Sequence, residues 1–161
     1  MTPAFMGAMS IADELRQRTF RYTLRVIAFC QKLTDTWVGR EIGRQLLRAG
    51  MGTSANYWSA CRGRSDREFI AKLGVAEDEA AESVMWLMLV VQSGLKQDPE
   101  AKALLAEGRE ITAILSKSHK TARENRRRKK AESKRKRTKL ATNQLTNLPT
   151  NQFTKSSEAP P

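Results

Sequence analysis

The chain has 161 residues, a formal net charge of +12 and a hydrophobic content of 40%, which is enough apolar material for one domain. Only 6% of the residues are aromatic, and the 9 glycines and 5 prolines are few turn-formers for this length. Abundant Ala, Leu, Glu, Arg and Lys argue against a β-sandwich or a disulfide-stapled scaffold and favour an all-α fold.

The first expected helix begins after Ser10, which serves as its N-cap, and ends near Leu33. Asp13 and Glu14 lie in its first turn, where the helix dipole favours negative charge. Residues that can pack in a core recur every three or four positions, at Leu15, Thr19, Tyr22, Val26, Phe29 and Leu33. This spacing predicts one buried stripe.

The second expected helix covers about residues 40–64, and its middle, AGMGTSAN, is rich in small residues. Each glycine inside a helix costs about 1 kcal/mol relative to alanine. We therefore expect a neighbouring helix to approach closely at this point. The alternative, a break of the helix at residues 50–53, stays open.

Two further helices follow. Ser65 and Glu68 form a capping box before a third helix that ends near Ser93, where Gly94 supplies the stop. Asp98 and Pro99 have the residue types typical of the start of a fourth helix. Four amphipathic helices with short connections can bury their stripes only against each other. The prediction is an antiparallel up-down four-helix bundle over residues 10–122, after a disordered N-terminus at residues 1–9.

The composition changes after the fourth helix. Residues 121–161 hold 12 Lys and Arg against 3 Asp and Glu, first in the basic run 123–139 and then in a stretch rich in Thr, Asn and Gln. The basic run has no apolar stripe to bury, so residues 123–161 are expected to be a disordered tail, although the run could prolong the fourth helix for some turns.

The basic run is also the strongest functional signal, because clustered cations bind polyanions through phosphate contacts. The candidate nucleic-acid contacts in it are Arg126, Arg127, Arg128, Lys129, Lys130, Lys134, Arg135, Lys136 and Arg137. On the expected bundle, Arg62, Arg64 and Arg67 near the turn between helices two and three are further candidates. Arg16, Arg18, Arg21 and Arg25 on the first helix are additional cations.

Helices two and three should form a hairpin. Reflection about its turn places Arg48 beside Glu82, which predicts a structural ion pair inside or at the edge of the bundle. Asn56 lies close to the apolar stripe and is expected to be a buried polar residue. Trp37, Trp58, Trp86 and Met88 exceed what one narrow stripe needs, so some of them are expected in a subunit interface.

Catalytic and metal sites are not expected. A di-iron bundle needs Glu-x-x-His motifs, and the single histidine, His119, lies outside the acidic cluster 77–82. The sequence contains no Walker loop, dinucleotide fingerprint or zinc-spaced Cys/His cluster. We therefore expect a non-enzyme without cofactor or metal.

The two cysteines, Cys30 and Cys61, form no CxxC pair, and the most apolar run, residues 84–91, is far shorter than the ~20 residues of a membrane span. The N-terminus lacks the basic and apolar regions of a signal peptide. These features predict a cytoplasmic protein with reduced thiols that does not bind membranes.

Residues 39–83, GREIGRQLLRAGMGTSANYWSACRGRSDREFIAKLGVAEDEAAES, resemble the 23S rRNA intervening-sequence proteins. The matching features are Gln45, Arg48-Ala49, Ser54, Asn56, Ala60, Ser65 with Glu68-Phe69-Ile70, and the segment from Ala76 to Glu82. The chain departs from the family at 57–60, where Tyr-Trp-Ser-Ala replaces the more frequent Ile-Ala-Glu-Gly, and in the added basic tail.

The resemblance implies a small bacterial up-down bundle that commonly assembles as a homopentamer. It extends to the accessory proteins of diversity-generating retroelements, which form positively charged barrels that bind nucleic acid and a reverse transcriptase. The first functional hypothesis is therefore a non-enzymatic, oligomeric protein that binds RNA or DNA. The alternative is a protein-interaction scaffold that docks a partner enzyme, with the tail incidental.

Overall fold

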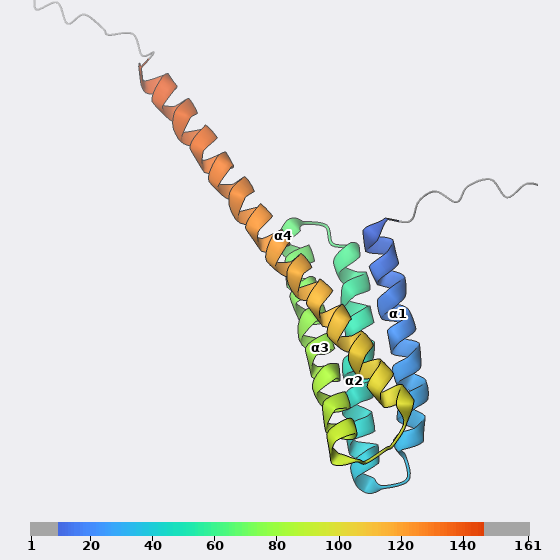
Figure 1. The fold of residues 1–161 in the computed structure, drawn as a ribbon. Coiled ribbons are helices and arrows are strands. Elements are labelled where there is room, and N and C mark those ends of the chain that lie inside the picture. Colours follow the sequence, from blue (N-terminus) through green and yellow to red (C-terminus); the bar gives the residue numbers. More distant parts are fainter. Residues whose placement is uncertain (1–9, 147–161) are drawn as a thin grey trace, which may run out of the picture. The chain divides into compact units, whose positions relative to one another are not determined.

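The computed structural model describes residues 10–146, which are helical except for their connections (Figure 1). The elements are α1 (Ile11–Cys30), a short 3-10 helix η1 (Gln31–Leu33), α2 (Trp37–Cys61), α3 (Asp66–Ser93) and α4 (Pro99–Thr146). The chain divides into two compact units, Met1–Glu124 and Asn125–Pro161. The expected disordered N-terminus, residues 1–9, lies outside the described residues.

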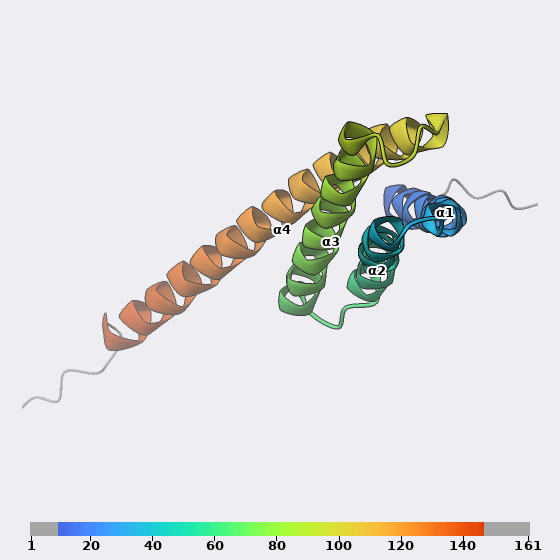
Figure 2. The same cartoon turned by 90° about the horizontal axis from the view of Figure 1, so that it is seen from below.

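The first unit contains α1, α2, α3 and the part of α4 up to Glu124, and its successive helices run antiparallel (Figures 1 and 2). Its core is a single cluster to which all four helices contribute, with Leu15, Val26, Phe29, Leu46, Leu73, Leu87, Leu104, Ile111 and Leu115 among its members. The all-α up-down bundle predicted from the sequence is therefore confirmed.

Local capping sets the helix boundaries. The side chains of Ser10 and Ser65 accept the backbone N–H groups of residues 13 and 68, and Gly94 ends α3 with φ 69°. These caps match the prediction. Thr36 caps α2 in the same way by accepting the Gly39 N–H, so this helix begins at Trp37, earlier than expected.

The small residues of α2 lie against α1, and α2 continues through them without a break. A Cβ atom added to Gly50 would lie 2.9 Å from Val26 Cγ1. The Thr23 hydroxyl lies 2.7 Å from the Gly50 carbonyl oxygen and 2.9 Å from Ser54 Oγ. The expected close approach is confirmed, and the alternative of a broken helix is wrong.

Tyr22 joins α1 to the two remaining helices. Its ring is buried, its hydroxyl lies 2.9 Å from Ser83 Oγ on α3, and a Cβ atom on Gly108 of α4 would lie 2.8 Å from that hydroxyl oxygen. Burial raises the pKa of Tyr22 to about 12, so the phenol stays protonated and hydrogen-bonded.

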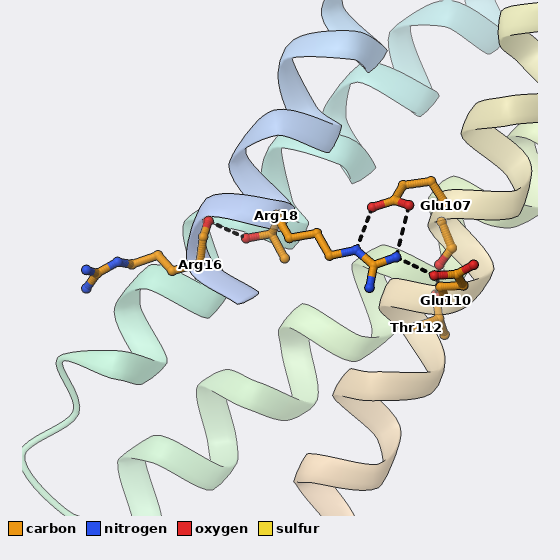
Figure 3. A network of polar contacts seen from close by, with 7 residues as sticks. Arg16, Arg18, Glu107, Glu110 and Thr112 are labelled. Atoms are coloured by element: carbon orange, nitrogen blue, oxygen red, sulfur yellow. Dashed lines mark hydrogen bonds and ion pairs between the residues drawn. The ribbon is translucent and has the colours of Figure 1, made fainter. Parts of the chain in front are cut away.

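An ion-pair cluster also ties α1 to α4 (Figure 3). Arg18 donates from Nε to Glu107 Oε1 at 2.7 Å and from Nη2 to Glu107 Oε2 at 3.0 Å, and Nη2 also pairs with Glu110. The hydrogen bonds from Arg18 hold the pKa of the Glu107 carboxyl below its usual value. Nearby, Arg25 pairs with Glu100 at 2.8 Å.

The largest difference from the sequence prediction concerns the tail. α4 continues through Thr146, so residues 123–146 are helical: the expected disorder of this part is wrong, and the alternative of a prolonged fourth helix is what the structure shows. No Gly or Pro occurs between positions 109 and 148, and Lys, Arg, Glu and Ala are strong helix formers. Helix propensity therefore extends a helix that the bundle has already nucleated. The rest of the predicted tail, residues 147–161, lies outside the described residues.

The two α2 glycines at positions 50 and 52 should respond oppositely to alanine. Gly50→Ala forces its new methyl group onto the buried Val26, and overpacking of about 1–3 kcal/mol outweighs the gain in helix propensity. The methyl group of Gly52→Ala has the Glu79 carboxylate as its nearest neighbour, and this flexible group can move away, so the variant should gain up to about 1 kcal/mol. Urea unfolding of both variants measures the difference, and equal stabilisation of both would contradict it.

Replacing Glu107 tests the α1–α4 ion pair. Glu107→Gln should cost about 1 kcal/mol of unfolding free energy at pH 7, because the Glu107 side chain is only 25% exposed and binds Arg18 through both oxygens. A carboxyl with a lowered pKa stabilises the fold above its unfolded-state pKa. The difference from wild type should therefore shrink as the pH falls below about 4.5 and vanish below the lowered pKa that Glu107 has in the folded state.

The matched control for this measurement is Glu110→Gln. Glu110 pairs with the same arginine, but its side chain is 66% exposed, so its loss should cost under about 0.5 kcal/mol. Chemical denaturation of both variants across pH 3 to 7 checks the prediction. A Glu107→Gln penalty that does not change with pH would show that the cost comes from packing.

Candidate nucleic-acid interface

The second unit carries a dense positive charge on a helix. We define the basic segment as residues 125–139 of α4, which hold ten Lys and Arg and one acidic residue, Glu132. The nine cations predicted from the sequence all lie in it, and every one is exposed: Arg126, Arg127, Arg128, Lys129, Lys130, Lys134, Arg135, Lys136 and Arg137. The structure thus brings this whole set onto one helix.

The cations of the basic segment surround the helix. Successive helical residues are rotated by about 100°, so the five consecutive cations at 126–130 point in all directions around the axis. Several lie four residues apart, such as Arg126 and Lys130, and like charges at this spacing repel. This distribution gives the segment a high positive potential on every side.

The three arginines predicted near the hairpin turn are also exposed, at one end of the first unit. Arg62 and Arg64 line a cavity of about 370 Å³ between the end of α2 and the start of α3. Arg67 is exposed but does not line this cavity. The remaining lining residues are Trp58, Ser59, Glu68 and Lys72.

Lys72 was missed at the sequence level, and Trp58 was predicted only as an interface residue. The signal that joins them is their position relative to Arg62: Trp58 lies one helical turn before it on α2, and Lys72 lies on the antiparallel α3. The side chains of two helices converge here because the connection between them is short.

Two arginines of α1 are committed to structure. Arg18 and Arg25 form the ion pairs with α4 described above, so they are not free to contact a polyanion. Arg16 pairs with Asp13 on its own helix and lies over the Trp58 ring. Of the first-helix cations noted in the sequence, Arg21 is exposed.

The structure does not bring Arg48 and Glu82 together as an ion pair within the described residues. Arg48 is exposed, and Glu82 accepts a hydrogen bond from Trp86 Nε1 at 3.1 Å. Both groups act on Glu79, whose Oε2 is buried without a hydrogen-bond partner. Burial and the charge of Glu82 raise the pKa of Glu79, and Arg48 opposes this. The prediction placed Arg48 and Glu82 in the right region, since both lie near Glu79, but Arg48 is exposed and does not pair with Glu82.

Asn56 is half-buried, less deeply than expected. Its Nδ2 donates to the Gly52 carbonyl oxygen one turn earlier on α2, at 2.9 Å. This hydrogen bond satisfies the amide within its own helix. Asn56 therefore makes a local contact in the structure of this chain.

His119 of α4 forms a contact with α3 that the sequence did not indicate. Its Nδ1 lies 2.7 Å from Glu77 Oε2, and the ring fits beside Gly74, where a Cβ atom would lie 3.0 Å from Cε1. Burial raises the pKa of Glu77, but hydrogen bonds from His119 and Ser116 outweigh it and bring the value below normal. The contact fixes α4 to α3 near the end of the first unit.

The described residues contain no group of three or more His, Cys, Asp or Glu side chains arranged to hold a metal ion. Within the same part of the chain, none of the helices combines the length and the apolar character that crossing a membrane requires.

Comparison with known proteins places the chain in a family. No match is found among curated proteins. A crystal structure of a protein of unknown function from the S23 ribosomal protein family of Bacteroides thetaiotaomicron superposes with a TM-score of 0.62 at 23% identity, covering 68% of this chain and 97% of that one. This likeness shows the fold. Residues 13–117, which span the bundle, match the family of the 23S rRNA-intervening sequence protein. The chain belongs to the 23S rRNA-intervening sequence protein family.

Proposed function

We propose that this chain is a non-enzymatic, oligomeric protein that binds nucleic acid through phosphate contacts of its basic segment. The observation that carries the proposal is the exposure of every side chain from Asn125 to Thr142 on a helix with ten cations between residues 125 and 139. These side chains are exposed to solvent, where a polyanion can reach them.

The dimensions of the basic segment suit a nucleic acid. Fifteen helical residues rise about 22 Å. Duplex DNA carries one negative charge per about 1.7 Å of axis, so the same length presents about 13 charges. An α-helix also fits the major groove of B-DNA, where cations on several sides of the helix reach phosphates on both strands. Phosphate contacts do not read sequence, so the proposal covers both RNA and DNA.

A homo-oligomer is part of the proposal. Apolar side chains are exposed on three helices of the first unit. Phe20, Leu24 and Met51 lie on α1 and α2, and Val75, Met85 and Leu89 lie on α3. A contact between the first of these groups and the second group of another copy would repeat around a closed ring. The pentamer implied by the family resemblance is one such ring.

The same apolar side chains favour a second candidate function. A surface that exposes Phe20, Leu24 and Met51 together fits a protein partner as well as a second copy. In this alternative the chain is a scaffold for a partner enzyme, and its basic segment is incidental. Substitutions in the basic segment separate the two candidates.

We propose a cytoplasmic location. Cys30 and Cys61 are free thiols in the structure, as expected for a reducing compartment. Burial raises the pKa of Cys30 to about 11, so this thiol is protonated and unreactive near neutral pH.

Neutralising part of the basic segment should lower the salt dependence of binding. The full-length variant with Arg135, Lys136 and Arg137 replaced by Gln keeps helix formers at all three positions. Each lost phosphate contact reduces the slope of log Kobs against log salt concentration by about 0.9 for duplex DNA. We expect the slope to fall by about 2 to 3, measured by fluorescence anisotropy with a labelled 20-base-pair duplex.

The matched control removes the same charge elsewhere. Replacing Arg21, Arg44 and Lys102 by Gln takes three exposed cations from the bundle and should change the slope by less than about 1. Equal effects of the two triple variants would show a response to net charge alone. An unchanged slope in the basic-segment variant would contradict the proposal and favour the scaffold alternative.

A charge on the apolar surface of α1 and α2 tests the assembly. Leu24 is 50% exposed, so Leu24→Glu leaves the core intact but places a carboxylate in the proposed contact. We expect the variant to dissociate to a monomer at micromolar concentration in sedimentation velocity. Ala103→Glu, on an exposed position of α4, is the control and should keep the wild-type assembly. A monomeric wild-type protein would contradict the proposal.

A further inference from the structure

Trp58 is a large aromatic side chain held in place at the surface of the first unit. It is 46% exposed, and its ring lies 6.2 Å from the Phe20 ring at an interplanar angle of 42°. The Arg16 guanidinium lies over the ring, 5.4 Å from its centroid, and is itself fixed by Asp13 at 2.5 Å. Contacts from α1 therefore hold the indole in one orientation before any ligand arrives.

The α3 side of Trp58 opens into the cavity of about 370 Å³ described above. Phe20 and Arg16 contact the ring but do not line this cavity. Trp58 stays 46% exposed despite these contacts, and it lines the cavity, so a flat ligand can reach it there. The cavity has the size of a small-ligand site, which suits one flat group better than a protein helix.

Cations surround the cavity. Arg62, Arg64 and Lys72 line it together with a single acidic residue, Glu68. One oxygen of Glu68 accepts the backbone N–H of Arg64 at 3.0 Å, as part of the α3 cap. Three cations against one engaged carboxylate favour an anionic ligand.

We propose that Trp58 is a stacking platform for an unpaired base of a single-stranded nucleic acid, with Arg62 and Lys72 contacting the phosphates beside that base. The inference rests on the proposed nucleic-acid function and adds a preference for single strands.

Only an unpaired base offers an open face to an indole that is held in place. In a duplex the base faces are covered by their neighbours, so a fixed indole has no face to meet. An unpaired base exposes its face, and stacking on an aromatic side chain tolerates any base. An aromatic platform flanked by cations is the arrangement that single-strand binding uses.

The cavity and the basic segment should therefore differ in which form of nucleic acid they bind. Phosphate contacts of the basic segment serve duplex and single strands alike, with a steep salt dependence. Stacking on Trp58 serves single strands only. A substitution at Trp58 should change the preference between the two forms of nucleic acid, which a general loss of charge would not do.

The experiment compares full-length wild type, Trp58→Ala and Trp58→Phe. The probes are a 12-nucleotide single-stranded RNA without self-complementarity, the DNA of the same sequence, and the duplex of that DNA. Trp58→Ala should weaken binding of the single strands about 5- to 150-fold and of the duplex less than twofold. Trp58→Phe retains an aromatic face and should recover most of the affinity.

Trp37→Ala is the matched control. Trp37 is 73% exposed and begins α2, at the opposite end of that helix from the cavity. Its loss should leave all three probes unaffected. In addition, a Trp37→Phe/Trp86→Phe variant leaves Trp58 as the single tryptophan, and its fluorescence should be quenched by the single strands and not by the duplex.

The outcomes separate this inference from the proposed function. Loss confined to single strands, with recovery by Trp58→Phe, supports it. Equal loss for single strands and duplex, no loss in Trp58→Ala, or a changed oligomeric state of that variant in sedimentation overturns the stacking role while nucleic-acid binding stands. Absence of binding by the wild type to every probe overturns both.

Discussion

The close approach of α1 to α2 at Gly50 fixes the spacing of these two helices in the middle of the bundle. Val26 fills the space that a side chain on Gly50 would need, and Thr23 donates a hydrogen bond to the buried Gly50 carbonyl oxygen. With α1 in this position, Tyr22 reaches Ser83 on α3 and closes against Gly108 on α4. The four helices are thus held by steric contacts that allow one register, in addition to the burial of their apolar stripes.

Helix number, order, caps and most of the core were predictable, because they depend on local signals. Apolar residues spaced three and four apart predict a helix and its buried face, and a serine before an acidic first turn predicts where the helix begins. The pairing of Arg18 with Glu107 was not predictable, since it depends on the rotation of two helices far apart in sequence. Arg48 is a second example. Counting residues from the hairpin turn predicted its position along α2, but not that its side chain would be exposed to solvent.

The candidate site also has a part that the sequence predicted and a part that it did not. The cations of the basic segment were visible as a charge run. The segment was expected to be disordered because it has no apolar stripe to bury, but helix propensity and nucleation by the bundle extend α4 through it. The cavity at Trp58 needs Arg62 and Lys72 from two antiparallel helices, and only the folded hairpin brings them to one place. Because these residues are far apart in the sequence and form no known motif, the site cannot be recognised from the sequence alone.

The helical form of the basic segment has a thermodynamic consequence. Cations four residues apart, such as Arg126 with Lys130 and Lys130 with Lys134, repel along the helix and reduce its stability. Any anion that neutralises them removes this repulsion, so helix formation and anion binding favour each other by linkage. Ionic strength then acts twice and in opposite directions, since salt screens the repulsion within the helix and also weakens its attraction to a polyanion.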